Sequence, residues 1–478
     1  MNLDIVISVL GKLVLLLGAM MFIPLGVALY YGESPSPFSQ SIALTITIGV
    51  LLSLRFLHTD DEWELREGFA IVAFGWLIIA LLGSLPFLYE GVSPLNAFFE
   101  SMSGFTTTGA TVLVDIESHS KSLLFWRSMI QWLGGMGIIM LFIAILPKLG
   151  VAGRQMFRAE APGPKEDQLK PRIRETAKIL WAVYLVISII ELMALLLAGL
   201  SPYDAITHTF TTMACGGFSP YANSIAAFGN PLAEGIITLF MFVAGANFAL
   251  HYRMLYSNKK ALLHDNEFKF YFAVIVVATI LLSALLWRDM SLNVTTSFRY
   301  AVFQTISILT TTGFATNDFN LWSDSGKAVL LAMMFIGGCA GSTAGGIKVV
   351  RVLLMLKYAR RELFKAIHPK AVKPIKFNNK IVPDDIMNAI ISFVVIYFLI
   401  FIASAGILAI LGMDLVSSIT ASIATLGNIG PGLNLIGPME NFDVVPSLGK
   451  LVLIANMWIG RLEIFTVIVM LTPEFWKR

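Results

Sequence analysis

The sequence predicts an all-α membrane protein in which four helix–pore helix–helix repeats surround a central pore, preceded by two further transmembrane helices. Three observations lead to this fold class. The chain of 478 residues is 56% hydrophobic and only 14% charged, whereas soluble proteins carry about 25% charged residues. Apolar runs of twenty or more residues recur along the chain with charge gathered between them, as in transmembrane helices. Four shorter apolar segments also recur, and each ends in a glycine-containing turn.

The apolar segments divide the chain into five parts. The first helix pair, residues 1–60, stands outside the repeat, and the predicted pore repeats cover residues 61–150, 151–257, 258–360 and 361–478. Each repeat holds one short apolar segment, near residues 94–108, 202–215, 297–312 and 414–427. A helix of about 13 residues covers roughly 20 Å, less than the roughly 30 Å of the hydrocarbon core. We therefore expect each short helix to enter the membrane and the chain to return to the same side.

Basic residues predict the orientation in the lipid bilayer. Lysine and arginine gather in segments 148–178 and 351–380, whereas segment 201–231 contains neither. Basic loops face the cytoplasm. We therefore expect a multi-pass protein with both termini cytoplasmic and with short helices that enter from outside.

The four short segments run into turns of similar composition. The turns read Phe105-Thr-Thr-Thr-Gly-Ala110, Met213-Ala-Cys-Gly-Gly-Phe218, Leu309-Thr-Thr-Thr-Gly-Phe314 and Leu426-Gly-Asn-Ile-Gly-Pro431. Aligned on Gly109, Gly217, Gly313 and Gly430, they are 108, 96 and 117 residues apart. One such turn is as well explained by small residues that pack helices together. Four at near-regular spacing indicate similar units around one axis.

This arrangement suits a cation. Four helix C-termini that point toward the membrane centre bring partial negative charge to one place, and glycine allows successive carbonyls to face one way. Rings of carbonyls can replace the hydration shell of a cation. Threonine hydroxyls at 106–108 and 310–312 add possible oxygen ligands, and no turn contains a carboxylate. Asp115 and Asp318 follow two of the turns and could draw cations to the mouth. The predicted ion-binding residues are Thr107, Thr108, Gly109, Gly216, Gly217, Thr311, Thr312, Gly313, Asn428, Ile429 and Gly430.

Seven motifs together resemble the Trk/Ktr/HKT superfamily of potassium transporters, and within it the TrkH subunit family. They are SMSGFTTTGAT (101–111), QWLGGMGII (131–139), TMACGGFS (212–219), LTTTGFAT (309–316), FIGGCAGSTAGGIK (335–348), TLGNIGPGL (425–433) and IGRLEIFT (459–466). The resemblance covers essentially the whole chain, and the two additional N-terminal helices favour TrkH over the shorter Ktr form.

The resemblance implies potassium uptake through a gated, channel-like pore, with K⁺ held at the filter residues. It also implies a homodimer with one pore per subunit, a cytosolic nucleotide-binding regulatory subunit of TrkA type, and a plasma-membrane location. Glycine at all four filter positions accompanies potassium selectivity in the family. The second turn, Cys-Gly-Gly, and the fourth, Gly-Asn-Ile-Gly, depart from Thr-Thr-Gly. We therefore expect a filter that is not four-fold symmetric and that discriminates imperfectly against sodium.

A glycine-rich stretch interrupts the second long segment of the third repeat. Residues 337–346 contain five glycines, and each costs about 1 kcal/mol relative to alanine in a helix. Close helix packing is one explanation, and a phosphate-binding loop fits poorly because the Gly-Lys-Ser/Thr ending is missing. Irregular backbone at membrane depth must be sheltered or face a cavity. We interpret the stretch as a movable barrier below the filter, as in the family, with gate residues Gly337, Gly338, Gly341, Ser342, Thr343, Gly345, Gly346 and Arg461.

Arg461 lies near the middle of the last apolar span, where a charge usually faces a cavity or a partner. One interpretation is a structural ion pair, for example with Glu463 of another subunit or of a neighbouring helix. The other is a positive charge below the filter that resists cation passage, so that its removal raises the flux. The further intramembrane polar residues Glu191, Gln131, Asn247 and Asn456 suit helix–helix contacts better than ion binding.

Two other functions stay open at this stage. A secondary transporter that couples K⁺ to H⁺ or Na⁺ would need a central carboxylate, for which Glu191 and Glu463 are the candidates. An intramembrane enzyme is disfavoured because no metalloprotease motif, paired aspartates or Ser/His dyad occurs. Cys215 and Cys339 suit buried free thiols, and we expect no bound cofactor and no nucleic-acid partner.

Overall fold

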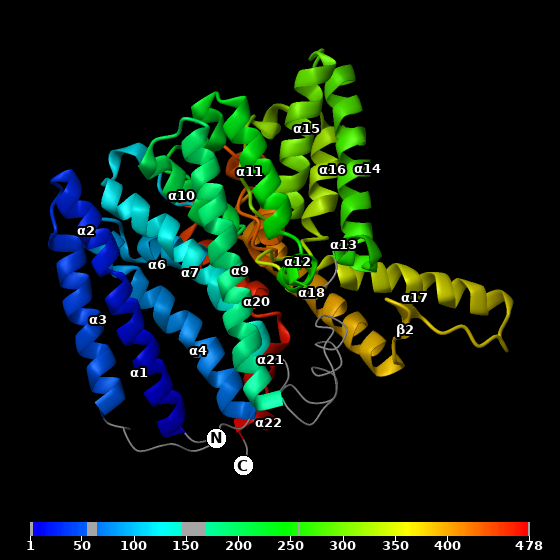
Figure 1. Cartoon of the computed structure of the whole chain (residues 1–478), viewed down its shortest axis with the longest axis horizontal. Coiled ribbons are helices and arrows are strands. Elements are labelled where there is room, and N and C mark those ends of the chain that lie inside the picture. The colour runs from blue at the N-terminus through cyan, green and yellow to red at the C-terminus, as the bar shows by residue number, and fades with distance from the viewer. Residues whose placement is uncertain (1–2, 55–64, 146–168, 257–258, 477–478) are drawn as a thin grey trace.

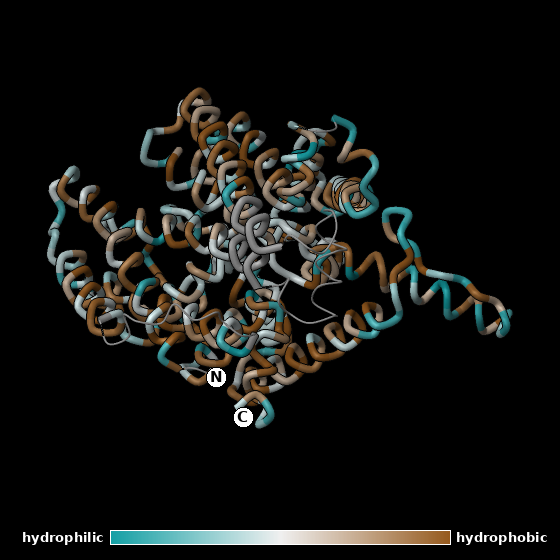
Figure 2. The backbone as a smooth tube through the Cα atoms, turned by 60° about the horizontal axis from the view of Figure 1, so that its bottom comes forward, coloured by the Kyte–Doolittle hydropathy of each residue, from teal (hydrophilic) through white to brown (hydrophobic). Residues whose placement is uncertain are grey.

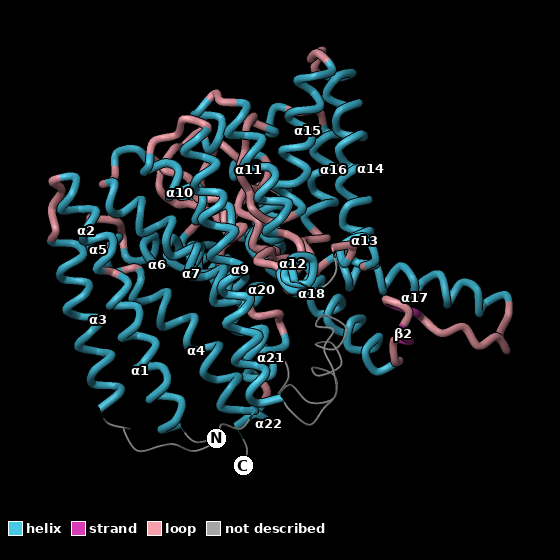
Figure 3. Tube along the Cα trace, in the orientation of Figure 1, coloured by secondary structure: helices cyan, strands magenta, loops and turns pink. Residues whose placement is uncertain are grey.

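The computed structural model describes residues 3–54, 65–145, 169–256 and 259–476. Long helices run roughly side by side, and loops cross the middle of the molecule between them (Figures 1 and 3). The domain boundaries predicted near residues 60, 150 and 257, and most of the basic segment 148–178, lie outside the described residues. The boundary predicted at residue 360 falls inside one helix, α17.

The first two units follow the predicted order. The N-terminal hairpin consists of α1 (Leu3–Met20), α2 (Phe22–Tyr31) and α3 (Ser36–Leu54). The next unit contains α4 (Leu65–Gly83), α5 (Leu85–Tyr89), α6 (Pro94–Phe105) and α7 (Lys121–Ile145). The unit after it contains α9 (Leu169–Leu197), α10 (Pro202–Met213), α11 (Pro231–Ala244) and α12 (Phe248–Tyr256).

The last two units repeat this order with additions. The third contains α13 (Ala261–His264), α14 (Asn266–Asp289), α15 (Val294–Leu309), α16 (Asp324–Met334) and α17 (Val349–Ile367). The fourth contains β1 (Lys376–Phe377), β2 (Lys380–Ile381), α18 (Asp384–Ile410), α19 (Leu415–Leu426), α20 (Ser447–Arg461), α21 (Phe465–Leu471) and α22 (Pro473–Trp476). Short 3-10 helices lie at Ile116–Ser118, Ser224–Phe228, Phe319–Leu321, Asn434–Ile436 and Phe442–Val444.

Membrane-length helices dominate the described part of the chain. Six of them are long and apolar enough to cross a membrane. Two bent pairs could each add a span: α11 with α12, bent by 95°, and α20 with α21, bent by 115°. Figure 2 shows hydrophobic residues along most of these helices. The fold is therefore an all-α membrane fold, as predicted.

Four short helices begin at residues that can cap them. Ser201, Asn293 and Asp414 each accept a hydrogen bond from a backbone N–H in the first turn of α10, α15 and α19. Such caps satisfy amide groups that have no partner inside the helix. Helix α6 follows Ser93 with proline at its first position, where a missing N–H costs nothing. These four helices are the predicted pore helices.

The last unit closes against the first. One hydrophobic cluster joins Phe105 of α6 and Trp126 of α7 to Leu453 and Met457 of α20. A second joins α14, α15 and α16 to α18 and α19. The units are thus packed in a ring around the pore-helix turns.

Helix α17 and the β1–β2 hairpin form an arm that projects from the bundle (Figure 1). Val350 and Leu354 of α17 pack with Phe377 and Val382 of the hairpin region and with Met387 of α18. The arm carries much of the predicted basic segment 351–380, and Figure 2 shows hydrophilic residues along it.

Candidate functional site

Each pore helix ends in the same pair of backbone hydrogen bonds. In the first, the N–H of Thr107 donates to the carbonyl of Gly104 at 2.9 Å, and that of Thr108 to Ser103 at 2.8 Å. Cys215 and Gly216, Thr311 and Thr312, and Asn428 and Ile429 make the equivalent pairs, at 2.8–3.2 Å. This pattern is the Schellman ending of a helix. It turns the chain by the same amount in all four repeats.

The turns share an alternation of backbone conformation as well. The Schellman residues Thr107, Cys215, Thr311 and Asn428 have φ values of 51–57°. The glycines two residues later, Gly109, Gly217, Gly313 and Gly430, have φ values of 77–100°. Glycine adopts such values freely, but for a β-branched residue such as Thr107 or Thr311 a positive φ is an outlier. Strained backbone of this kind clusters at functional sites.

The four turns surround one axis. A Cβ atom added to Gly109 would overlap the carbonyl oxygen of Gly216, and one added to Gly217 would overlap that of Thr312. A Cβ on Gly313 would meet the Ile429 carbonyl in the same way. The series closes on the first turn, because a Cβ on Gly430 would lie 2.8 Å from the carbonyl oxygen of Thr108. Each glycine therefore permits a close approach between neighbouring turns, and the carbonyls of all four lie in one ring.

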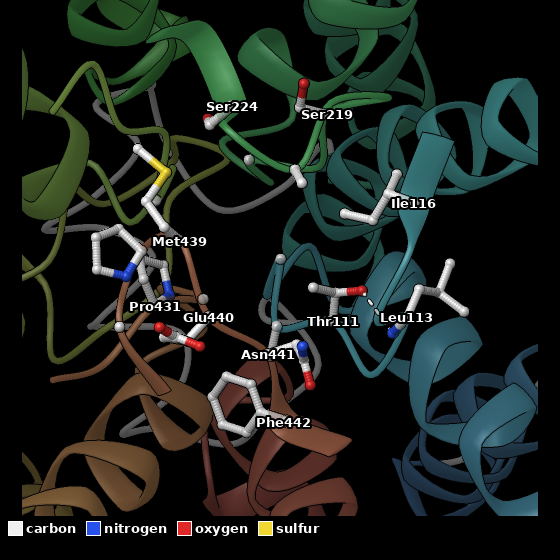
Figure 4. Close-up of a pocket in the computed structure, with 18 of the residues that line it drawn as sticks. Thr111, Leu113, Ile116, Ser219, Ser224, Pro431, Met439, Glu440, Asn441 and Phe442 are labelled. Atoms are coloured by element: carbon white, nitrogen blue, oxygen red, sulfur yellow. Dashed lines mark hydrogen bonds between the residues drawn. The ribbon is translucent and has the colours of Figure 1, made fainter. Parts of the chain in front are cut away.

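A pocket opens on the outer side of this ring. Its lining includes the four glycines together with Thr111, Ser219, Pro431 and Glu440. Figure 4 shows Thr111, Ser219, Pro431 and Glu440 on segments of different repeats around the pocket. Neither Asp115 nor Asp318 lines the pocket, and Asp318 instead accepts a hydrogen bond from the N–H of Asn320. The acidic residue among those that line this pocket is Glu440, which the sequence analysis did not single out.

The glycine-rich stretch breaks the helix as predicted. Residues 335–348 are irregular between α16 and α17, and we call them the inner loop. The loop contacts the filter turns from the opposite side to the pocket. The N–H of Gly345 donates to Thr311 Oγ1 at 2.7 Å, and Thr343 Oγ1 donates to the carbonyl of Met213 at 2.9 Å and approaches Cys215 Sγ at 3.2 Å. A Cβ on Gly345 would overlap the carbonyl of Gly427 in the fourth turn.

Side chains and backbone from two other elements hold the inner loop. Glu267, at the start of α14, accepts from the N–H of Ala340 at 2.7 Å and from that of Val350 at 3.2 Å. The N–H of Cys339 donates to the carbonyl of Gly245, in the break between α11 and α12. Asn247 lies in that break too, within contact distance of Gly341. It therefore belongs to the surroundings of the loop rather than to a helix–helix contact.

Arg461 reaches the inner loop from the end of α20. Its Nη1 donates to the carbonyl of Thr343 at 2.9 Å, and the residue is 3% exposed. Among the described residues, its Nε and Nη2 have no hydrogen-bond partner. Glu463 pairs instead with Arg351 of α17 at 2.5 Å. An Arg461–Glu463 ion pair, one of the two interpretations of the sequence, is therefore not what this conformation shows.

The side chain of Gln131 does not make the helix–helix contact that the sequence analysis expected. Its side chain donates to the carbonyl of Gly216 at 2.7 Å and accepts from the N–H of Phe218 at 3.1 Å. It therefore contacts the backbone of the second filter turn. Asn456 lies 3.5 Å from Thr425 of the fourth pore helix. Glu191 is fully buried on α9, and neither carboxylate oxygen has a hydrogen-bond partner within the described residues.

Comparison with known proteins identifies the family to which the chain belongs. A family model described as TrkH, cation transport protein, matches residues 35–478. The chain belongs to the TrkH family. It is 40% identical to the Trk system potassium uptake protein TrkH of Salmonella typhimurium and 38% identical to that of Halomonas elongata, over the full length of each protein. The crystal structure of the potassium transporter TrkH from Vibrio parahaemolyticus superposes with a TM-score of 0.92 at 38% identity, covering both chains entirely.

Within this TrkH-family chain, three residues of the site escaped the sequence analysis. Glu267 and Arg351 lie at helix ends beside charged neighbours, where nothing in the sequence separates them from ordinary flanking charges. Glu440 lies ten residues after its filter glycine, so only the path of the loop brings it to the mouth. The four predicted filter turns contact one another, and three of the predicted gate residues, Thr343, Gly345 and Arg461, contact these turns or each other.

Proposed function

We propose that the chain carries K⁺ passively across the membrane through the ring of filter turns, and that the inner loop gates this pathway. The observation that carries the proposal is the closed series of glycine-to-carbonyl contacts, with the inner loop bonded to the ring from the other side. A carbonyl ring suits a dehydrated monovalent cation. The relatives described above are potassium uptake proteins and a potassium transporter, which favours K⁺.

The filter acts by replacing water around the ion. Its ligands are the backbone carbonyls of the four turns, supplemented by hydroxyl groups such as that of Thr107, whose Oγ1 is buried without a hydrogen-bond partner in the described part of the chain. Partial negative charge at four helix C-termini stabilises the cation. Because no carboxylate lies in the turns, the ion leaves without breaking a strong ion pair.

The inner loop and Arg461 act as the barrier. A buried guanidinium with two unsatisfied nitrogen atoms repels a cation that has passed the filter. The loop adds a steric obstacle because it contacts the second, third and fourth turns. Opening requires two hydrogen bonds to break. One joins Gly345 of the loop to Thr311, and the other joins Thr343 to the carbonyl of Met213.

Regulation from the cytoplasm fits the position of the arm. Helix α17 begins directly after the inner loop and carries Arg351, Lys357, Arg360, Arg361 and Lys365. A cytosolic nucleotide-binding TrkA-type subunit that displaced the arm would pull on the loop. We include in the proposal a homodimer with one pore per subunit, in the plasma membrane with both termini cytoplasmic.

One observation favours a second candidate, coupled transport with H⁺ or Na⁺. The buried carboxyl of Glu191 has no hydrogen-bond partner among the described residues. It does not line the outer pocket. Replacement by glutamine separates the two mechanisms: passive conduction leaves uptake without an imposed proton gradient intact, whereas coupled transport loses its response to the gradient.

The test is ⁸⁶Rb⁺ uptake into liposomes that contain the purified protein, with K⁺ or Na⁺ as competitor. Passive, K⁺-selective conduction predicts strong competition by K⁺, weak competition by Na⁺ and no need for a proton gradient. Uptake that required an imposed proton gradient would support the coupled mechanism instead. Equal competition by both ions would refute a selective filter.

A further inference from the structure

The four filter turns are not braced in the same way. In the first turn the hydroxyls of Thr106 and Thr108 lie 2.8 Å apart, and in the third those of Thr310 and Thr312 do the same. Each pair of hydroxyls links two residues of the same turn that are two positions apart. The second turn has Ala214 and Gly216 at these two positions, so it has no hydroxyl pair of its own.

Helix α7 supplies the missing contacts to the second turn. The amide of Gln131 donates to the carbonyl of Gly216 and accepts from the N–H of Phe218, at 2.7 and 3.1 Å. One helical turn earlier, Arg127 Nη1 donates to the carbonyl of Ser219 at 2.7 Å. The guanidinium also lies 3.6 Å from the centre of the Phe218 ring. Two side chains of one helix therefore contact three residues along the second turn and its exit.

Gln131 and Gly216 fit together sterically. A Cβ atom on Gly216 would overlap the amide group of Gln131. The space that a threonine side chain needs in the first and third turns is thus filled here by a side chain from α7. This explains why the second turn reads Cys-Gly-Gly and not Thr-Thr-Gly.

A buried counter-charge fixes Arg127. Its Nε lies 2.6 Å from Glu100 Oε1, and the two side chains are 3% and 0% exposed. Glu100 in turn accepts from Thr111 Oγ1 at 3.0 Å and from the N–H of Val112 at 2.9 Å, just after the first filter glycine. The ion pair therefore joins the exit of the first turn to that of the second. Removal of one partner from such a pair leaves a buried charge uncompensated.

We infer that Gln131 and Arg127 are the positioning residues that hold the second filter turn in its K⁺-selective geometry, with Glu100 as the counter-charge that fixes Arg127. This inference rests on the proposed filter function. Neither Gln131 nor Arg127 contacts the ion: both act through the backbone of residues 216–219. Loss of their contacts widens the range of carbonyl positions in one turn of the ring, and discrimination between K⁺ and Na⁺ falls while transport persists.

The test measures ⁸⁶Rb⁺ uptake with K⁺ or Na⁺ as competitor for Gln131→Leu, which removes both hydrogen bonds, and for Gln131→Glu, which is isosteric but, when ionised, cannot donate to the Gly216 carbonyl. Loss of a buried hydrogen bond predicts a fall of about tenfold in the K⁺ preference. Ser128→Ala is the matched control, because Ser128 is equally buried on α7 but its hydroxyl donates only to Leu124 of the same helix. We expect it to keep the wild-type preference.

Three further variants sharpen the test. Gly216→Ala should lose K⁺ preference because of the overlap with Gln131, and Gln131→Ala combined with Gly216→Ala should recover part of it. Arg127→Lys keeps the charge but lacks the separate Nε and Nη1 donors that bind Glu100 and the Ser219 carbonyl, and should show a smaller loss if the Gln131 variants do not fold.

The outcomes separate this inference from the proposed function. If the preference is unchanged in every folded variant of Gln131 and Arg127 while Gly313→Ser lowers it, the filter stands and the inference is wrong. If Gly313→Ser also leaves the preference unchanged, the filter function itself fails. A gain in uptake without any change in preference would place Gln131 in gating and overturn the inference too.

Discussion

The filter turns and the inner loop are both irregular backbone in the middle of the bundle, yet they are held in different ways. Every filter turn has its own Schellman hydrogen bonds and contacts the glycine of a neighbouring turn. The inner loop has no such repeated pattern, and its contacts with the ring are single bonds from Gly345 and Thr343. Further hydrogen bonds to the loop come from Glu267, Arg461, the carbonyls of Ala244 and Gly245, and the N–H of Phe248.

This difference indicates that the inner loop can move more easily than the filter turns. A filter turn that shifted would break two backbone bonds and disturb its neighbour in the ring. The inner loop exchanges only a few hydrogen bonds, each worth about 1 kcal/mol net, when it leaves the ring. A rigid ring above a weakly held loop is what selective conduction with gating requires.

The largest effect on ion preference is expected when the ring of filter turns is itself altered. Gly313→Ser adds a side chain at φ 82° and places it against the carbonyl of Ile429. Strain of about 1–3 kcal/mol should lower the preference for K⁺ over Na⁺ by about fivefold or more. Competition assays with ⁸⁶Rb⁺ measure the ratio. Gly235→Ser serves as control, because a Cβ there meets nothing within 4 Å, and an unchanged ratio in Gly313→Ser would contradict a rigid ring.

The next largest effect is expected when the buried positive charge of Arg461, which contacts the inner loop, is removed. Arg461→Ala deletes the bond to the Thr343 carbonyl and the positive charge below the filter. We expect basal ⁸⁶Rb⁺ uptake to rise about tenfold, on the order of 1.4 kcal/mol of barrier, with the K⁺ preference retained. Arg461→Lys keeps a charge and should stay near wild type. Uptake by the alanine variant that does not exceed the wild type would remove Arg461 from the gate.

A smaller effect is expected at the anchor of the loop. Glu267→Ala removes the acceptor for the N–H groups of Ala340 and Val350. Loss of buried hydrogen bonds should loosen the loop and raise basal uptake by about two- to fivefold. Glu234→Ala is a matched control, since Glu234 is a buried carboxylate that pairs with Arg299 away from the loop. Equal changes in both variants would indicate general destabilisation rather than gating.

The smallest effect concerns the outer surface. Asp443 pairs with Lys450 at 2.8 Å, and Lys450 also donates to Asn96. The hydrogen bond from Lys450 lowers the pKa of Asp443 below its usual value of 3.8. A depressed carboxyl pKa stabilises the fold above the unfolded pKa, and this contribution is lost as the pH falls through the lower folded value. Because Asp443 is 43% exposed, Asp443→Asn should cost less than about 1 kcal/mol in thermal unfolding at pH 7, and nothing near pH 2.

The sequence predicted the fold, and the presence of four similar turns, because both depend on local patterns. Hydrophobic length identifies spanning helices, and the Thr-Thr-Thr-Gly turns repeat within the chain. The environment of single polar residues could not be predicted in the same way. Gln131 reads as a helix-packing residue until the second turn is seen beside it, and Glu463 reads as a partner of Arg461 until the bend after α20 turns it toward Arg351. These contacts join residues 85 to 112 positions apart, so only the fold determines them.

The most direct test of the account combines the two regions in one protein. ⁸⁶Rb⁺ uptake by Gly313→Ser, Arg461→Ala and the double variant would be measured side by side, with K⁺ and Na⁺ as competitors. A rigid filter and a separate movable loop predict that the ion preference follows residue 313 whatever stands at 461, and that the basal flux follows residue 461. A double variant with wild-type preference, or an Arg461→Ala variant that loses preference without any gain in flux, would contradict the division between filter and gate.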